Sequence, residues 1–175
     1  MKLQTQVPLQ RANHQIDYSS RVLLLGSCFS EHIGAKLTHF KFRTTQNPFG
    51  ILFHPLAIEN VLSRALKKEK YTTDDVFFNN DRWHCFDAHS VLSHSSKEAL
   101  LQALNQGLET TYIGMRQATH ICITLGTAWV YRHKETNKVV ANCHKVPQVN
   151  FTKELLDSAN ITKSLITMVG LVHDI

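Results

Sequence analysis

The chain has 175 residues, enough for one domain, and its hydrophobic (43%) and charged (19%) fractions are those of an ordinary globular protein rather than a disordered or fibrous one. Its net charge of +5 comes from scattered Lys and Arg residues, which predicts no nucleic-acid partner. No apolar run approaches the ~20 residues of a transmembrane helix, so no membrane partner is expected. The polar N-terminal segment lacks the apolar stretch of a secretory signal, which favours a cytoplasmic location.

The first predicted element is a short strand at residues 21–25, an apolar run that ends at Gly26. A run of this kind is typical of a strand that is buried on both faces. Phe29, Ile33 and Leu37 then recur at helical spacing, which predicts a helix with these residues on its apolar face. Strand, tight turn and helix together form the opening of a β/α unit.

The later elements alternate between helices and strands, which favours an α/β fold with a parallel sheet. In chain order we predict a strand and turn at 40–50, a helix at 56–69, a hairpin or a structured loop at 76–86, and a helix capped by Ser95 or Ser96. A strand at 120–125, a hairpin with its tip at 133–138, and a helical pattern at 152–173 that weakens near Asn160 follow. Only two strands are strong, and the pattern stops after a helix. We therefore expect residues 1–20 to be a lead-in, and 21–175 to be the N-terminal part of a larger domain.

The cysteines are candidate disulfide partners, and several histidines are candidate metal ligands. With no secretory signal and no dense cysteine framework, reduced thiols are expected for Cys28, Cys85, Cys122 and Cys143. A metal-dependent enzyme would have to draw its ligands from His84, Asp87, His89 and His144. No spacing among these matches a known ligand pattern, so neither a metal nor another cofactor is expected.

The turn Gly26-Ser27-Cys28 is the strongest candidate site, because ligands of parallel α/β sheets bind beyond the carboxyl ends of the strands. The free N–H groups and the dipole of the following helix favour an anion there, and a thiolate is the nucleophilic form of cysteine. Cys28 is therefore a candidate nucleophile, the alternative being a thiol that packs like a small hydrophobic residue. Ser27 is the second candidate nucleophile, or else a turn residue that caps the helix.

The segment VLLLGSCFSEHIGAKL resembles the start of the GSCFA family, which is named for a Gly-Ser-Cys-Phe-Ala motif; here Ser30 takes the fifth position. Four further stretches resemble the family in the same order: NPFGILFHP (47–55), WHCFDAHSVLS (83–93), LGTAWVY (125–131) and VVANCHKVP (139–147). The resemblance runs from about residue 20 to about residue 150. It implies the fold of the SGNH/GDSL hydrolases, a flavodoxin-like parallel sheet flanked by helices.

The resemblance also implies roles for residues of the turn and of the segment at 47–50. The Gly-Asp-Ser block of the SGNH hydrolases corresponds to Gly26, Ser27 and Cys28, so the thiol takes the place of the nucleophilic hydroxyl. Gly50 is the local candidate for an oxyanion N–H, and a plain turn glycine is an equally good interpretation.

The third block of the SGNH pattern, Gly-x-Asn-Asp, corresponds to the segment that begins Gly126-Thr127. Ala128 stands where the block has Asn, so that oxyanion donor is missing, and Asn47 or Asn142 is a candidate to replace it.

The general base of the pattern belongs to an Asp-x-x-His block near the C-terminus, which does not occur at the end of this chain. His144 and His89 are the local candidates for the base, and a structural or surface role is the alternative for each. We therefore expect this chain alone to have little or no turnover.

The resemblance implies an ester hydrolase or acyltransferase whose substrate is a small-molecule ester such as an acylated carbohydrate. The alternative is an inactive module that binds a small anion at the helix N-terminus. An incomplete sheet also exposes an apolar edge, which predicts self-association into an oligomer.

Overall fold

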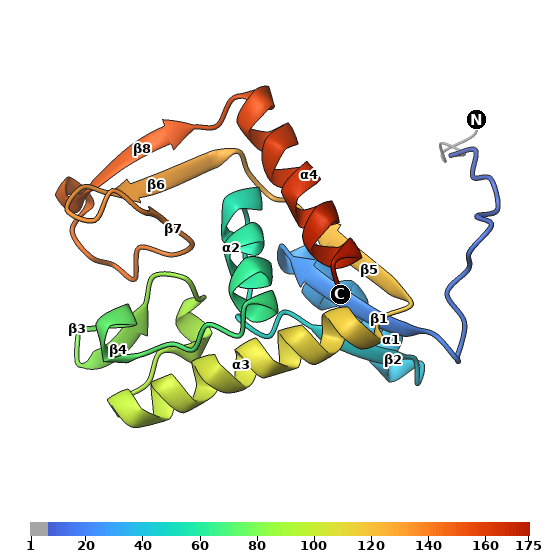
Figure 1. The fold of residues 1–175 in the computed structure, drawn as a ribbon, viewed down its shortest axis with the longest axis horizontal. Helices are drawn as coiled ribbons and strands as arrows, with labels where there is room; N and C mark the ends of the chain where they lie inside the picture. Colours follow the sequence, from blue (N-terminus) through green and yellow to red (C-terminus); the bar gives the residue numbers. More distant parts are fainter. Residues whose placement is uncertain (1–6) are drawn as a thin grey trace, which may run out of the picture.

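A computed structural model describes residues 7–175 of the chain. Its helices and strands are β1 (Arg21–Gly26), α1 (Cys28–His39), β2 (Arg43–Gln46), α2 (Pro55–Leu66), β3 (Val76–Asn79), β4 (Arg82–Cys85), α3 (Lys97–Gln117), β5 (His120–Thr124), β6 (Trp129–His133), β7 (Val139–Val140), β8 (Phe151–Leu155) and α4 (Ser158–His173). Residues 7–19 are exposed, contain no helix or strand, and extend away from the body of the molecule (Figure 1).

The central sheet has three parallel strands in the order β2-β1-β5. β1 lies in the middle and is buried from Val22 to Gly26, which confirms the strand predicted at 21–25. The strand order is that of the first three strands of a flavodoxin-like sheet. The predicted α/β class with a parallel sheet is therefore confirmed.

Helices cover the central sheet (Figure 1). α1 packs against β1 and β2, and α3 crosses β1, where a Cβ on Gly114 would lie 3.1 Å from Leu23 Cδ1. Because successive side chains of a strand point to opposite faces, the face of β1 that carries Leu23 and Leu25 is the one turned to the main core. α2 packs between α3 and α4 and supplies the fully buried Ile58 and Leu62 to that core.

The packing face of α1 differs from the prediction. The helix itself is confirmed, but its buried residues are Ser30 and Gly34, whereas Phe29 is 61% exposed. Gly34 lies so close to Gln46 that a Cβ on it would come within 2.0 Å of Oε1. A close approach between α1 and β2 has thus replaced the apolar contact that the spacing of Phe29, Ile33 and Leu37 indicated.

A second, antiparallel sheet has the strand order β7-β6-β8. The helix predicted from residue 152 is wrong before Ser158, because Phe151–Leu155 pairs with β6 as a strand. The pairing is supported by the Arg132–Glu154 ion pair (2.9 Å) and by burial of Phe151. The helix begins only at Ser158, where the Asp157 carboxylate accepts the N–H of Asn160 at 2.7 Å.

The other predicted elements are confirmed with small shifts at their ends. The hairpin is β3–β4, the helix capped by Ser96 is α3, and its Ser96 hydroxyl accepts the N–H of Ala99 at 3.2 Å. β6 and β7 form the second predicted hairpin. Among residues 7–175, no helix combines the length and the apolar character needed to cross a membrane.

Candidate active site at the carboxyl end of the central strand

The chain leaves β1 through a turn that only glycine fits. Gly26 has a φ of +127°, and a Cβ on it would lie 2.0 Å from the Thr124 carbonyl oxygen at the end of β5. The N–H of Ser27 donates to this same oxygen at 3.0 Å. The turn therefore stays joined to β5, and the first residue of α1 has a fixed position at the edge of the sheet.

The Thr124 hydroxyl is the centre of a small network beneath the turn. It lies 2.9 Å from the Ser27 hydroxyl and 2.8 Å from the Ser30 hydroxyl, and it accepts the N–H of Ser27 at 3.1 Å. Ser30 also donates to the carbonyl of Leu25 at 3.1 Å. Ser27 is buried and its hydroxyl is engaged with another hydroxyl rather than with a base, so its observed contacts are those of a residue that holds the turn.

Cys28 is the first residue of α1 and its side chain is exposed. Ser27 makes no capping hydrogen bond to the helix. Within the described part of the chain, no acceptor is bonded to the N–H groups of Cys28, Phe29 and Ser30. The thiol thus sits beside backbone donors that are available to an anion.

Asn47 supplies a further donor next to the turn. Its Oδ1 accepts the N–H of Gly26 at 2.8 Å, and its own N–H donates to the Leu24 carbonyl at 2.9 Å. Only the oxygen of the amide can accept from an N–H, so the orientation of the side chain is determined. The Nδ2 group is buried and has no partner among residues 7–175. A buried donor without an acceptor is costly, which makes it a candidate for contact with a ligand.

The N–H groups of three candidate site residues, Gly50, Gly126 and Thr127, are already engaged. The N–H of Gly50 donates to the carbonyl of Asn47 at 2.8 Å, within its own turn. The N–H groups of Gly126 and Thr127 both donate to the carbonyl of Phe53, at 2.8 and 3.1 Å. The two bonds to Phe53 hold the loop between β2 and α2 against the segment that follows β5.

The two predicted histidine bases lie apart from this turn's hydrogen bonds. His144 is only 5% exposed, and its Nε2 lies 2.7 Å from the carbonyl oxygen of Cys85. Burial lowers the pKa of His144 to about 4. His89 lies beside Gly50 and its Nδ1 accepts the N–H of Val91 at 3.3 Å. No hydrogen bond between described residues joins either histidine to Cys28.

Asn142 and the potential metal ligands have structural contacts. The Asn142 Oδ1 accepts the N–H of His144 at 2.8 Å, in the loop that follows β7. No group of three His, Cys, Asp or Glu residues within 7–175 could hold a metal ion. Asp87 instead contacts Tyr71 (3.3 Å) and Arg64 (3.8 Å), and burial raises its pKa.

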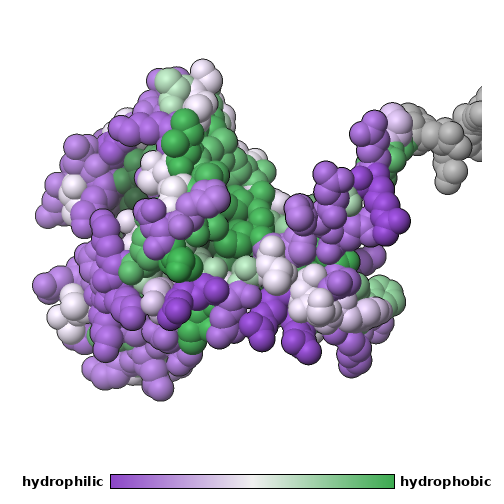
Figure 2. Space-filling view, turned by 45° about the vertical axis from the view of Figure 1, so that its right-hand side comes forward, coloured by the Kyte–Doolittle hydropathy of each residue, from purple (hydrophilic) through white to green (hydrophobic). Residues whose placement is uncertain are grey.

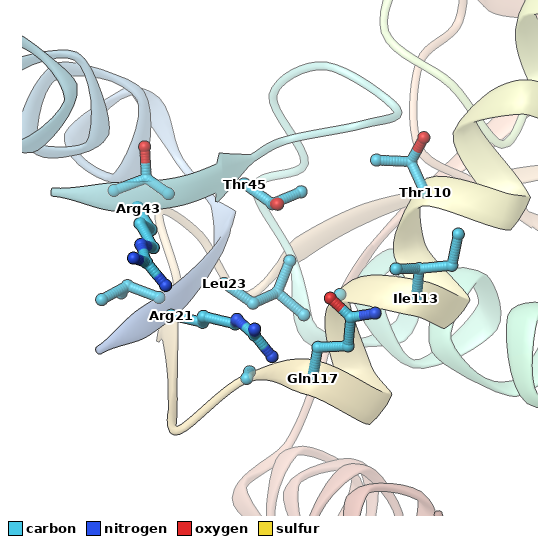
Figure 3. A pocket seen from close by; sticks show the side chains of 11 residues that line it. Arg21, Leu23, Arg43, Thr45, Thr110, Ile113 and Gln117 are labelled. Carbon is cyan, nitrogen blue, oxygen red and sulfur yellow. The ribbon is translucent and has the colours of Figure 1, made fainter. Parts of the chain in front are cut away.

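A separate hollow lies at the other end of the central sheet, between the first residues of β1 and β2 and the C-terminal half of α3 (Figure 3). Arg21 and Arg43 are register partners there, and Leu23 and Ile113 form apolar parts of the wall. The sequence pattern gave no indication of this hollow, because it depends on where α3 crosses the sheet.

The fold and the turn define an α/β protein with a cysteine at the carboxyl end of its central parallel strand. The sequence profile of the GSCFA family matches residues 21–175, and the chain belongs to this family. No curated protein and no solved structure matches the chain.

Proposed function

We propose that this chain provides the nucleophile and the anion-stabilising donors of an ester hydrolase or acyltransferase, with Cys28 as the nucleophile. One observation carries the proposal: an exposed thiol begins α1 directly after the buried central strand, beside N–H groups without acceptors. The SGNH-like pattern supports the same assignment, because Cys28 takes the position of the nucleophilic serine. A small-molecule ester, such as an acylated carbohydrate, is the proposed substrate.

In the proposed reaction, the Cys28 thiolate forms a bond to the ester carbonyl carbon. The carbonyl oxygen becomes an oxyanion, which accepts hydrogen bonds from the N–H groups at the start of α1 and from Asn47 Nδ2. The carbon–oxygen bond then breaks, and the alcohol leaves with a proton from the solvent. Water or a second alcohol attacks the thioester and releases an acid or a new ester. Ser27, Ser30 and Thr124 hold the turn in position.

The arrangement of the histidines predicts which step is slow. The His144 ring lies against the Cys85 carbonyl and the His89 ring accepts the N–H of Val91, so neither predicted base is held beside Cys28 to activate the water that cleaves the thioester. A thiol is nucleophilic without a strong base, whereas water is not. We therefore expect the acyl thioester to accumulate in this chain, with little turnover.

The alternative function is a module that binds a small anion without reacting with it. The same free donors at the start of α1 and at Asn47 favour this alternative, and an ester need not be involved. Titration with inorganic phosphate or acetate, combined with the labelling experiment below, separates the two. Anion binding without acylation of Cys28 supports the module, and acylation supports the enzyme.

The test is acylation by p-nitrophenyl acetate, followed by peptide mass spectrometry. We expect one acetyl group on the peptide that contains Cys28, released with p-nitrophenol in a single burst. Cys28→Ala should remove the adduct and the burst, whereas Cys122→Ala, which removes another thiol, should leave both unchanged. Ser27→Ala should keep the adduct on the same peptide. An adduct that persists in Cys28→Ala would show that the thiol is not the nucleophile.

A further inference from the structure

A hollow of about 440 Å³ lies on the second sheet, next to the loop that crosses the end of the central sheet. Its walls include the aromatic residues Phe53, Trp129, Tyr131 and Phe151, together with Thr127 and Val146. Its volume lies within the range of ordinary small-molecule sites.

The hollow borders the Cys28 turn at Phe53. The carbonyl of Phe53 accepts the N–H groups of Gly126 and Thr127, and its ring lies 2.8 Å from where a Cβ on Gly126 would stand. The same Cβ would lie 3.5 Å from Ser27 Cβ. Phe53 and Thr127 thus belong to the wall of the hollow and to the surroundings of the turn.

The chemistry of the walls selects a neutral, apolar occupant. No Asp, Glu, Lys or Arg lines the hollow. His54 is the titratable ring in the wall; burial lowers its pKa, and its two nitrogens are engaged by Ala57 N (3.1 Å) and Val140 O (3.1 Å). The Thr127 hydroxyl accepts the N–H of Trp129 at 2.9 Å. Asn142, Gln148 and Tyr131 add polar groups to the walls, but most of the lining is apolar, which suits an acyl chain better than a sugar ring.

We infer that this hollow binds the apolar acyl group of the ester, with the scissile carbonyl held at the Cys28 turn. The inference rests on the proposed function for its substrate, but the binding itself can be measured without any reaction. It predicts a preference for medium-length acyl chains over acetyl, since each buried methylene adds to the free energy of binding. The alcohol part of the ester lies outside the hollow.

Binding is tested with octanamide, an uncharged mimic of an octanoyl ester that cannot acylate a thiol. We expect octanamide to change the fluorescence of Trp129 in the Cys28→Ala protein, and Trp129→Phe to abolish the change. Val146→Phe fills the hollow and should weaken octanamide binding by about tenfold or more. Val149→Phe is the matched control, because Val149 is 71% exposed and does not line the hollow.

Acylation of the thiol is tested separately, with p-nitrophenyl octanoate and p-nitrophenyl acetate. Unaltered protein should be acylated faster by octanoate, and Val146→Phe should lose that preference while Val149→Phe keeps it. Acylation of Cys28 with no chain-length preference and no octanamide binding would overturn the inference and leave the proposed function standing. Octanamide binding that Val146→Phe weakens, without acylation of Cys28, supports the apolar site and overturns the proposed enzyme. Circular dichroism of both variants checks that they fold.

Discussion

At the scale of single residues, the most informative side chain is Asn47, which the resemblance offered only as a substitute donor. Its Oδ1 holds Gly26, and its Nδ2 is the buried donor without a partner. This arrangement separates its structural role from its proposed chemical role, because each depends on a different atom of the same amide.

Asn47→Asp should separate these two roles by experiment. The aspartate keeps an oxygen to accept the Gly26 N–H but lacks the N–H donor and adds a negative charge beside the developing oxyanion. We expect the rate of Cys28 acylation to fall by about 100-fold, a typical loss for one oxyanion donor. Asn160→Asp is the control, since Asn160 is exposed near the start of α4 and the substitution should leave the rate unchanged. Equal burst rates in Asn47→Asp and unaltered protein would remove Asn47 from the site.

The buried His144 should make the free energy of unfolding depend on pH. In the folded protein its pKa is about 4, because the ring is buried, whereas the unfolded value is near 6.5. Between these values the unfolded state binds the proton, so the free energy of unfolding falls as the pH falls from about 6.5 to 4, by about 3 kcal/mol in total. Above pH 6.5 the ring is neutral in both states and contributes no pH dependence.

Urea unfolding at several pH values measures the slope of the free energy of unfolding against pH. His144→Asn should flatten it, and Asn also tolerates the left-handed backbone that His144 adopts (φ +49°). His39→Asn, which changes an exposed histidine at the end of α1, should leave the slope as it is. Identical slopes in His144→Asn and unaltered protein would rule out this histidine as their source.

How far the candidate site could be predicted depends on the range of the contacts involved. The turn at Gly26-Ser27-Cys28 follows from a local pattern: an apolar strand, a glycine and a helix. The contact between Asn47 and Gly26 spans 21 residues and depends on the path of a loop, which no local pattern records. For the same reason the sequence did not reveal that the N–H groups of Gly50, Gly126 and Thr127 already have acceptors.

At the scale of elements, the segment Phe151–Leu155 shows why short apolar patterns mislead. Leu155 and Leu156 fit the helical spacing of the residues after them, but five residues cannot tell a helix from a strand. Pairing with β6 decides the outcome, and this long-range contact is absent from the local sequence. The local pattern also misleads in α1, where the small residues Ser30 and Gly34 form the buried face instead of the large apolar residues.

Replacing either of two glycines by alanine should change the stability of the protein, in opposite directions at the two positions. Gly26→Ala places a Cβ 2.0 Å from a backbone oxygen at a positive φ, so it should cost about 3 kcal/mol or more of stability. Gly170 lies in α4, where a Cβ would meet nothing within 4 Å, so Gly170→Ala should add about 0.5–1 kcal/mol. Urea denaturation of the two variants measures both effects. A stable Gly26→Ala protein would contradict the geometry of the turn.

At the scale of the whole molecule, hydrophobic side chains form a continuous green area on the side that carries α4 in Figure 1, as Figure 2 shows. Leu155 at the end of β8 is 59% exposed, and Ile166 and Val169 on α4 are 67% and 58% exposed. α4 packs against α2 through residues such as Met168, which is 1% exposed, so its outer face is left with apolar residues in contact with water. An exposed apolar area of this kind favours association with a second copy.

We therefore expect concentration-dependent self-association, measured by size-exclusion chromatography with light scattering. The double substitution Ile166→Glu and Val169→Glu should shift the protein to a monomer, because two carboxylates would have to be desolvated at the contact. Val149→Glu is the matched control, since Val149 is equally exposed but lies in the turn before β8, away from α4. A protein that is monomeric at every concentration would contradict the expectation. If the control also dissociates the assembly, net charge rather than the α4 face governs it.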